Sequence, residues 1–238
     1  MRVMLLALWL LAPALALADP SADEILRGAD TILAPEEYES EVTFVTHKGP
    51  DQARTFSLHV LKKGTDQLRV TFISPPDDKG AEFLRLGDDM WNYLPNLKRA
   101  LKIPPKQEFH GGDFANADIL RVDLAQDYVP TILPSDSSGQ WLLDLRAKTD
   151  QVAYARIKYW IRKGDLMPLR EEFYTASGKL VRKLEIKKTR AFGGITRPSH
   201  LVMQNLLIPS RFSEMIVDNF TLRKGIDRSL FDLGALGR

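Results

Sequence analysis

The sequence predicts a mainly β protein in which a curved antiparallel sheet of about ten or eleven strands closes partly or fully into a barrel. Three observations predict this fold. Apolar residues alternate with polar ones along most of the chain, short turn sequences rich in glycine, proline and aspartate separate these runs, and no strong linker divides them. Because a sheet this wide twists and curls, we expect one N-terminal helix and one lid segment against its concave face.

Residues 1–18 have the three parts of a secretory signal peptide: Arg2 near the start, an apolar run over residues 3–17, and a cleavage point after Ala18. We expect residues 19–238 to form one exported, soluble domain. Since the sequence contains no cysteine, disulfides and a lipid anchor on cysteine are both excluded. With 33 Lys and Arg against 31 Asp and Glu, the charge predicts no nucleic acid or other polyanion as partner.

A capping box marks the start of the N-terminal helix, where Ser21 and Glu24 can satisfy the free backbone amides of the first turn. Apolar residues follow at helical spacing until Pro35 stops the run. These residues are Ile25, Leu26, Ala29, Ile32 and Leu33. We expect the helix to pack under the sheet.

From residue 39 the apolar period changes to two, which is typical of half-buried antiparallel strands. The first half ends in a hairpin of residues 81–86 and 90–94, followed by a short arm near 100–103. The second half contains the predicted strands 140–147, 154–162, 166–175, 179–192, 196–204 and 214–223. Short turns such as Gly193-Gly194 make neighbours in sequence neighbours in the sheet.

Residues 95–139 alternate little apart from that short arm and are rich in proline, glycine, asparagine and aspartate. A compact domain seldom holds so long a connection without a function for it. Asn116 can cap a short helix that presents Ile119 and Leu120, and Gly111 and Gly112 provide a hinge with free backbone angles. We interpret the interval as a movable lid.

No catalytic, metal or cofactor site is predicted. The four histidines stand apart from one another, and the spacing of Glu108, His110 and Asp113 is common by chance among solvated loops. An exported hydrolase stays open as an alternative, because active sites are recognised by geometry and not by sequence order.

Basic residues gather in the second half of the chain. Arg156, Lys158 and Arg162 share one face of their strand, and Glu171, Glu172 and Glu185 are interleaved among the cations. The ordinary explanation is a solvated outer face that prevents edge-to-edge aggregation. The alternative is a docking patch for anionic head groups or an acidic partner protein.

Trp91 and Tyr93 lie on one side of their predicted strand, and Met90 and Leu94 lie on the other. Core packing explains aromatic residues in most strands, but the lid sequence that follows directly favours a ligand-lining role for one set. An acyl chain of some fifteen carbons gains about 12 kcal/mol when buried, at about 0.8 kcal/mol for each methylene. If a cavity exists, a lipid is therefore the expected guest.

The sequence resembles the periplasmic lipoprotein-sorting carriers of the LolA type. The resemblance rests on Lys79-Gly80 followed by a strand and on three longer motifs: residues 90–99, MWNYLPNLKR; Gly111-Gly112-Asp113-Phe114 followed by Asp118-Ile119-Leu120; and residues 226–231, IDRSLF. It implies an unclosed antiparallel barrel of strands with a helical lid and an apolar cavity for acyl chains, without catalysis. In this family aromatic and aliphatic residues line the cavity, which here implies Trp91, Tyr93, Leu94, Phe114, Ile119 and Leu120.

The expected function is therefore that of a soluble periplasmic carrier, a monomer without cofactor, that shields acyl chains of lipoproteins or lipids between the inner and outer membranes. The resemblance implies an inner-membrane transporter as donor, of the ABC or RND type, and an outer-membrane acceptor. The alternative is an interaction module that carries nothing and docks to such a transporter through Arg156, Lys158 and Arg162.

Overall fold

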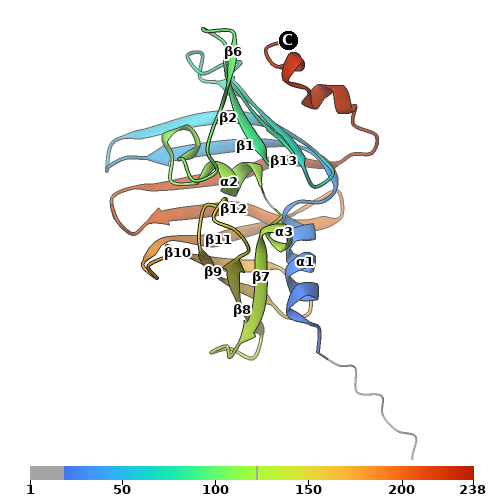
Figure 1. Ribbon diagram of the computed structural model, residues 1–238, viewed down its shortest axis with the longest axis vertical. Coiled ribbons are helices and arrows are strands. Elements are labelled where there is room, and N and C mark those ends of the chain that lie inside the picture. The colour runs from blue at the N-terminus through green and yellow to red at the C-terminus, as the bar shows by residue number, and fades with distance from the viewer. Residues whose placement is uncertain (1–18, 122) are drawn as a thin grey trace, which may run out of the picture.

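A computed structural model describes residues 19–121 and 123–238. In this part of the chain thirteen strands form one antiparallel sheet, in the order β6-β5-β4-β3-β2-β1-β13-β12-β11-β10-β9-β8-β7. The strands at the two ends, β6 and β7, do not pair with each other, so the sheet is an unclosed barrel, as predicted. Its twist turns the edge strands roughly crosswise to the central ones (Figure 1). The predicted signal peptide lies outside the described residues.

The strands of the first half are β1 (Glu37–His47), β2 (Ala53–Lys63), β3 (Gln67–Ser74), β4 (Glu82–Leu86), β5 (Asp89–Leu94) and β6 (Arg99–Lys102). Those of the second half are β7 (Tyr128–Leu133), β8 (Gln140–Ala147), β9 (Arg156–Arg162), β10 (Pro168–Tyr174), β11 (Leu180–Phe192), β12 (Ile195–Asn205) and β13 (Phe212–Leu222). The pairing of β1 with β13 joins the two halves.

Thirteen strands exceed the ten or eleven expected, and one strand lies where only a lid was predicted. β7 pairs with β8 and contains Pro130, which cannot donate a ladder hydrogen bond. An edge strand tolerates proline because one of its sides has no partner strand. The sequence argues against a strand at this point, yet the position of β7 at the edge of the sheet permits it.

Helix α1 (Ala22–Leu33) begins at the predicted capping box. The Glu24 amide donates to Ser21 Oγ at 3.3 Å, and the Ser21 amide donates to Glu24 Oε2 at 2.8 Å. The helix buries Ile25, Leu26 and Ala29 and contacts β7, β12 and the short helix α3 (Leu124–Asp127). It therefore closes the concave side of the sheet near the β7 edge (Figure 1).

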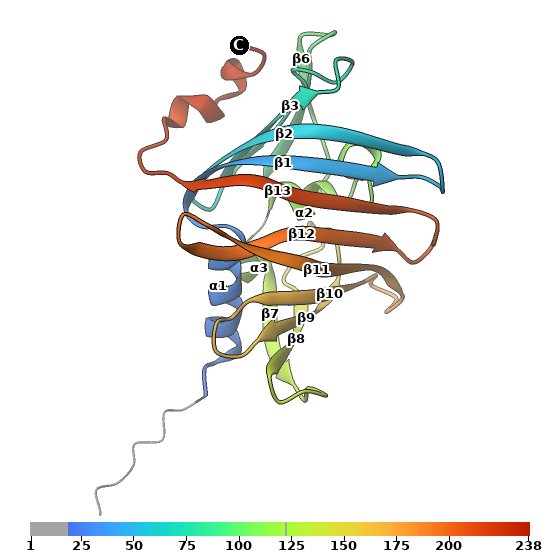
Figure 2. The same ribbon diagram turned by 180° about the vertical axis from the view of Figure 1, so that it is seen from behind.

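The C-terminal segment covers the outer, convex face of the first half of the sheet. Its 3-10 helices η2 (Arg228–Phe231) and η3 (Leu233–Ala235) lie beside the strands that precede β6, at the far end of the molecule from α1 (Figure 2). Phe231 is fully buried against Leu84 in a small core of its own. Beneath the segment, Arg69 pairs with Glu82 at 2.8 Å and donates to the Leu230 carbonyl at 2.9 Å.

No helix in residues 19–121 or 123–238 has the length and apolarity that a membrane span requires.

Candidate functional site

A cavity of about 150 Å³ lies between the concave face of the sheet and the segment that crosses it. Apolar side chains from β1, β2, β11, β12 and β13 form its wall, including Val42, Leu58, Leu184, Leu201, Met203 and Val217. Phe114, Ala117 and Ile119 close it from the opposite side, and Leu33 at the end of α1 closes one end. The arrangement provides a mostly apolar, partly open space between the sheet and the crossing segment.

Residues 103–121 cross over the cavity, and we call this segment the lid. It holds the 3-10 helix η1 (Phe109–Gly111) and the helix α2 (Asn116–Leu120). Phe109 and Phe114 pack their rings against Phe44, at centroid distances of 5.5 Å and 5.8 Å. The lid therefore adds aromatic residues to the core in addition to covering the cavity.

The paired glycines of the lid have two separate roles. Gly111 has φ +74° and follows His110 at φ +46°, so the chain reverses here through a left-handed turn. At Gly112 a Cβ atom would lie 2.8 Å from the Phe44 ring and 3.1 Å from Ser213 Oγ, so only glycine lets the backbone approach the sheet this closely. Gly111 thus forms a left-handed turn and Gly112 serves close packing, while the hinge expected at these glycines stays a prediction.

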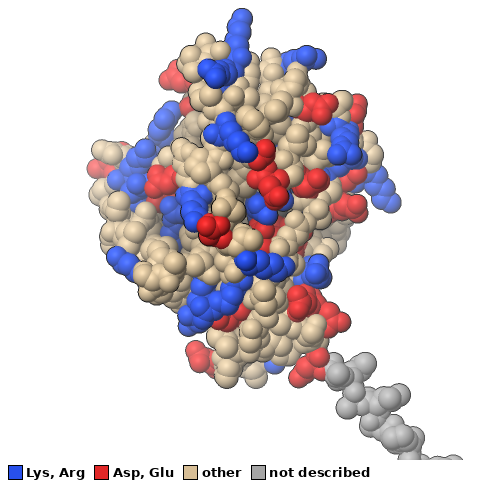
Figure 3. Space-filling model, viewed as in Figure 1, with Lys and Arg blue, Asp and Glu red and all other residues tan. Residues whose placement is uncertain are grey.

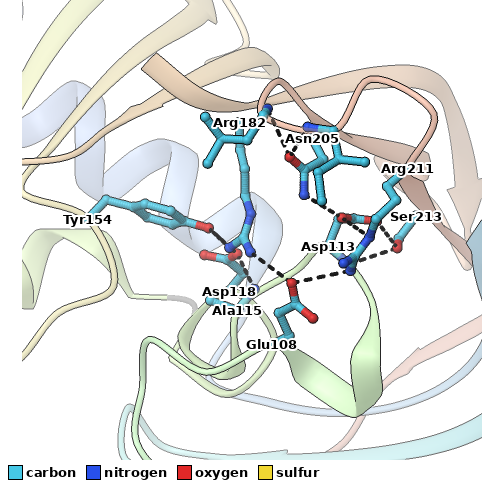
Figure 4. A network of polar contacts seen from close by, with 11 residues as sticks. Glu108, Asp113, Ala115, Asp118, Tyr154, Arg182, Asn205, Arg211 and Ser213 are labelled. Atoms are coloured by element: carbon cyan, nitrogen blue, oxygen red, sulfur yellow. Dashed lines mark hydrogen bonds and ion pairs between the residues drawn. The ribbon is translucent and has the colours of Figure 1, made fainter. Parts of the chain in front are cut away.

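Polar contacts fasten the lid to the sheet (Figure 4). Asp113 is 1% exposed and accepts hydrogen bonds from Asn205 Nδ2 at 3.0 Å and Ser213 Oγ at 3.1 Å. The Asp113 amide donates to the same Ser213 oxygen at 2.9 Å. Arg211 reaches Asp113 at 3.4 Å and Glu108 at 3.2 Å. One end of the lid is thus held by β12, β13 and the turn between them.

A second set of contacts holds the other end of the lid. Asp118 accepts from the Ala115 amide at 2.7 Å, which caps α2, and from the Tyr154 hydroxyl at 2.9 Å. Arg182 of β11 donates to that hydroxyl at 2.8 Å and lies 3.9 Å from Glu108. Burial raises the pKa of Asp118 to about 6. The two aspartates of the GGDF and DIL motifs therefore act as the fastening points of the lid.

Five acidic or basic side chains line the mostly apolar cavity, and they differ in which groups, if any, balance their charge. Asp118 is held as described, and Arg121 pairs with Asp127 at 2.6 Å. Glu171 is 6% exposed, and burial raises its pKa to about 8, so it is protonated at neutral pH. Arg197 is 7% exposed and has no carboxylate partner in the described chain.

The structure places only part of the predicted acyl-chain site at the cavity. Phe114 and Ile119 line it, and Leu120 is fully buried in the adjoining core. Leu94, at the end of β5, is half-buried and lies outside the lining.

Trp91 and Tyr93 lie on the convex face, where they pack with Phe231 and Leu236 of the C-terminal segment. Their expected place in the cavity wall is wrong, because Met90 and not Trp91 points to the concave side of β5.

Because of this placement, we expect Trp91→Ala to act on stability and not on ligand binding. Loss of the indole from the contact with the C-terminal segment should lower the free energy of unfolding by about 2 kcal/mol. Acyl-chain binding should stay within twofold of the wild type, whereas Phe114→Ala on the lid should weaken it. Urea unfolding and a fluorescent fatty-acid titration measure the two effects, and a large binding defect in the Trp91 variant would contradict the placement.

The candidate docking residues lie on the outer face of β9 and are partly neutralised. Arg156 pairs with Asp144, and Arg162 pairs with Asp165 at 2.6 Å, while Lys158 lies 5.9 Å from the centre of the Tyr174 ring. Acidic and basic side chains are also interspersed over the face that carries the lid (Figure 3). Glu171, counted among the surface acids from the sequence, points into the cavity instead.

The spacing of Glu108, His110 and Asp113 does not bring these side chains together. Glu108 turns to Arg211, Asp113 turns to Asn205, and His110 Nε2 lies 2.8 Å from Asp78 on the opposite side. Burial lowers the pKa of His110 despite that carboxylate. No group of three potential metal ligands gathers in the described residues.

Several residues of the site belong to no sequence motif, so the sequence alone does not identify them. Tyr154, Arg182, Asn205 and Ser213 come from four separate places in the second half of the chain and meet only in the fold. Strand periodicity does place Glu171 on the same face as Phe173, and Arg197 on the same face as Leu201. That alternation was the available sign that two charged residues face inward.

Comparison with known proteins agrees with this architecture. A family model described as an uncharacterized protein matches residues 64–238. No curated protein matches the chain. The crystal structure of a LolA superfamily protein from Nitrosomonas europaea is similar, with a TM-score of 0.82 and 26% identity over 91% of this chain and 100% of that one.

Two further structures share the fold. A DUF1329 family protein from Desulfovibrio piger has a TM-score of 0.80 and 22% identity over 90% of this chain and 97% of its own. A putative outer membrane lipoprotein-sorting protein domain from Vibrio parahaemolyticus has a TM-score of 0.76 and 22% identity over 91% of this chain and 100% of its own. With its open sheet, lid and motif aspartates, the chain belongs to the LolA-like family.

Proposed function

We propose that the protein is a periplasmic carrier that binds the acyl chain of a lipid or lipoprotein in the lidded cavity. The observation that supports the proposal is the cavity itself, a partly open space with mostly apolar walls under a segment fastened by polar contacts. A fold neighbour described as a putative outer membrane lipoprotein-sorting domain supports the same class of cargo. Residues 1–18 act as the export signal, and residues 19–238 act as one monomeric, non-enzymatic domain.

The cavity must enlarge before it takes a whole acyl chain. Its volume of about 150 Å³ is below the roughly 300–1,000 Å³ of ordinary ligand pockets. Since each buried methylene gains about 0.8 kcal/mol, a long chain supplies the free energy to displace Phe114 and to separate the lid from the sheet. The lid contacts then re-form when the chain leaves, which favours release.

The path for the chain passes between the lid and the β5–β6 edge. A second, wider hollow of about 740 Å³ lies between this edge and residues 126–127 and 148–151. Met90, Ile103 and Pro104 contribute apolar lining, and most of its other lining residues are charged or polar. Arg121 and Asp127 line both this hollow and the inner cavity, so their ion pair stands between the two. Separation of that pair joins the two spaces into one long groove.

Filling the cavity tests the proposal. Leu184→Trp places a bulky side chain in the cavity wall, and we expect it to weaken the binding of a fluorescent fatty acid at least tenfold. Lys183→Trp is the matched control, because Lys183 is the neighbour on the outer face of the same strand, where it lies 3.5 Å from Glu172. Equal binding by both variants would overturn the cavity as the acyl-chain site.

A module that docks to an inner-membrane transporter through Arg156 and Lys158 is the alternative function. The two functions predict different results for the same variants. If the protein is a docking module, charge reversal at Arg156 and Lys158 abolishes its function, and Leu184→Trp leaves that function intact. The pairing of Arg156 with Asp144 favours the carrier, since a neutralised cation attracts an acidic partner less strongly.

A further inference from the structure

Arg197 is the one cation on the cavity wall, within the described chain, that lacks an ionic partner. Its Nη2 donates to the Leu33 carbonyl at 2.7 Å, at the end of α1. Its Nε and Nη1 are buried and have no hydrogen-bond partner. The guanidinium stacks on Phe220, with Cζ 3.7 Å from the ring centre. Two donor nitrogens of a buried cation, Nε and Nη1, are therefore left without an acceptor at the wall of a mostly apolar space.

Such an arrangement is costly without an anion. Removing a guanidinium from water carries a large penalty, which a carboxylate partner or full hydrogen bonding normally offsets. Here aromatic stacking and one carbonyl offset only part of it, and burial lowers the pKa of Arg197. The other cation on the cavity wall, Arg121, has Asp127 as its ionic partner. Of these two cations, only Arg197 lacks a carboxylate that balances its charge.

The carboxyl groups of the cavity do not supply the missing charge. Asp118 is engaged by Tyr154, and Asp127 by Arg121. Glu171 has a pKa of about 8, so at neutral pH it is an uncharged acid and would not repel a bound anion. The cavity therefore combines an apolar wall, a neutral carboxyl and one uncompensated cation near the end of α1.

We propose that Arg197 binds the carboxylate head of a long-chain fatty acid or a closely similar single-chain amphiphile, whose alkyl tail runs toward Phe114. This inference rests on the proposed function and specifies its ligand. A carboxylate matches the planar guanidinium and accepts charge-assisted hydrogen bonds from it. Nε and Nη1 are buried where the guanidinium lies beside the end of α1 and against the Phe220 ring, so the head group reaches them only when the side chains around Arg197 move apart.

The test compares a fatty acid with its uncharged counterpart. Lipid-free protein is titrated with cis-parinaric acid and with its methyl ester, which share the chain and the fluorophore. We expect the wild type to bind the acid about tenfold more tightly than the ester. Arg197→Met should bind both ligands within twofold of each other, because it loses the preference for the acid.

Two further variants separate head-group binding from a structural role of Arg197 beneath α1. Arg197→Lys keeps the charge and should retain part of the preference for the acid. Arg170→Met is the matched control, because Arg170 also stacks on an aromatic ring, with Cζ 3.7 Å from the centre of Trp160, but on the outer face. The Arg170→Met variant should keep the full wild-type preference for the acid over the ester. Thermal melts report whether each variant folds.

The outcomes distinguish this inference from the proposed function. Equal binding of acid and ester by the wild type, or an unchanged preference in a folded Arg197→Met, would overturn the role of Arg197 and leave the acyl-chain cavity standing. If the wild type bound neither ligand, the proposed function would fail together with the inference. If Arg197→Met does not fold, the wild-type comparison and Arg197→Lys decide the question.

Discussion

Asp113→Ala is expected to lower the free energy of unfolding by about 3–5 kcal/mol, the loss typical when one partner of a buried charged network is removed. Asp113 is 1% exposed and accepts from both Asn205 and Ser213. Without its carboxylate these donors remain buried and unsatisfied, and Arg211 keeps only Glu108. The lid then keeps only the backbone amide of residue 113 on Ser213 and the pair of Glu108 with Arg211 as its attachment to this part of the sheet.

Urea unfolding measures this loss, and hydrogen exchange over residues 103–121 shows whether it is concentrated in the lid. Acyl-chain association should become faster, since the closed state no longer resists opening. Asp136→Ala, in an exposed turn, is the control and should change the stability by less than about 0.5 kcal/mol. A loss for Asp113→Ala as small as that of the control would mean that the network does not hold the lid.

Glu171→Gln is expected to stabilise the protein at alkaline pH and to change little at acidic pH. The folded-state pKa of about 8 lies above the ordinary value of 4.5. In the unfolded chain the carboxyl ionises first, so wild-type stability falls as the pH rises from about 4.5 to about 8 and then levels off. Glutamine cannot ionise, so the variant escapes this loss, which amounts to about 5 kcal/mol at about 1.4 kcal/mol for each pKa unit.

Unfolding at about pH 4.5 and about pH 8.5 measures the difference. Glu172→Gln is the matched control, because Glu172 is adjacent but faces outward, where it accepts from the Tyr174 hydroxyl at 2.6 Å. Only the Glu171 variant should gain stability with pH relative to the wild type. A parallel pH dependence for the wild type and Glu171→Gln would contradict the burial of an uncharged carboxyl in the cavity.

Local signals were sufficient for much of the fold. The capping box at Ser21, the alternation of β1 to β3 and the hairpin of β4 and β5 follow from residues near one another in sequence. The lid was also identifiable, because a run of prolines and glycines interrupts the alternation, and the motif residues Phe114 and Ile119 do face the cavity. The capping box, the alternation and the hairpin each depend on interactions between residues close in sequence.

The errors arose where distant segments decide the environment. Alternation assigns Trp91 and Tyr93 to one face of β5 but cannot say that a segment some 140 residues later covers that face. The sequence alone indicates that Glu171 is a surface residue. The curved sheet places the face that carries Glu171 on the inside, where this residue lines the cavity. The strand β7 contains Pro130, and only its place at the edge explains why that proline is tolerated.

The union of β1 with β13 has a consequence for how the chain folds. Phe44 lies opposite Met215, so the centre of the sheet is formed by contacts between the two ends of the sequence. Contacts of such long separation slow folding, because the entropy of closing the loop is lost before the strands pair. A chain cut before residue 212 would keep both hairpin halves but leave β1 and β12 as two additional open edges, each able to pair with another molecule.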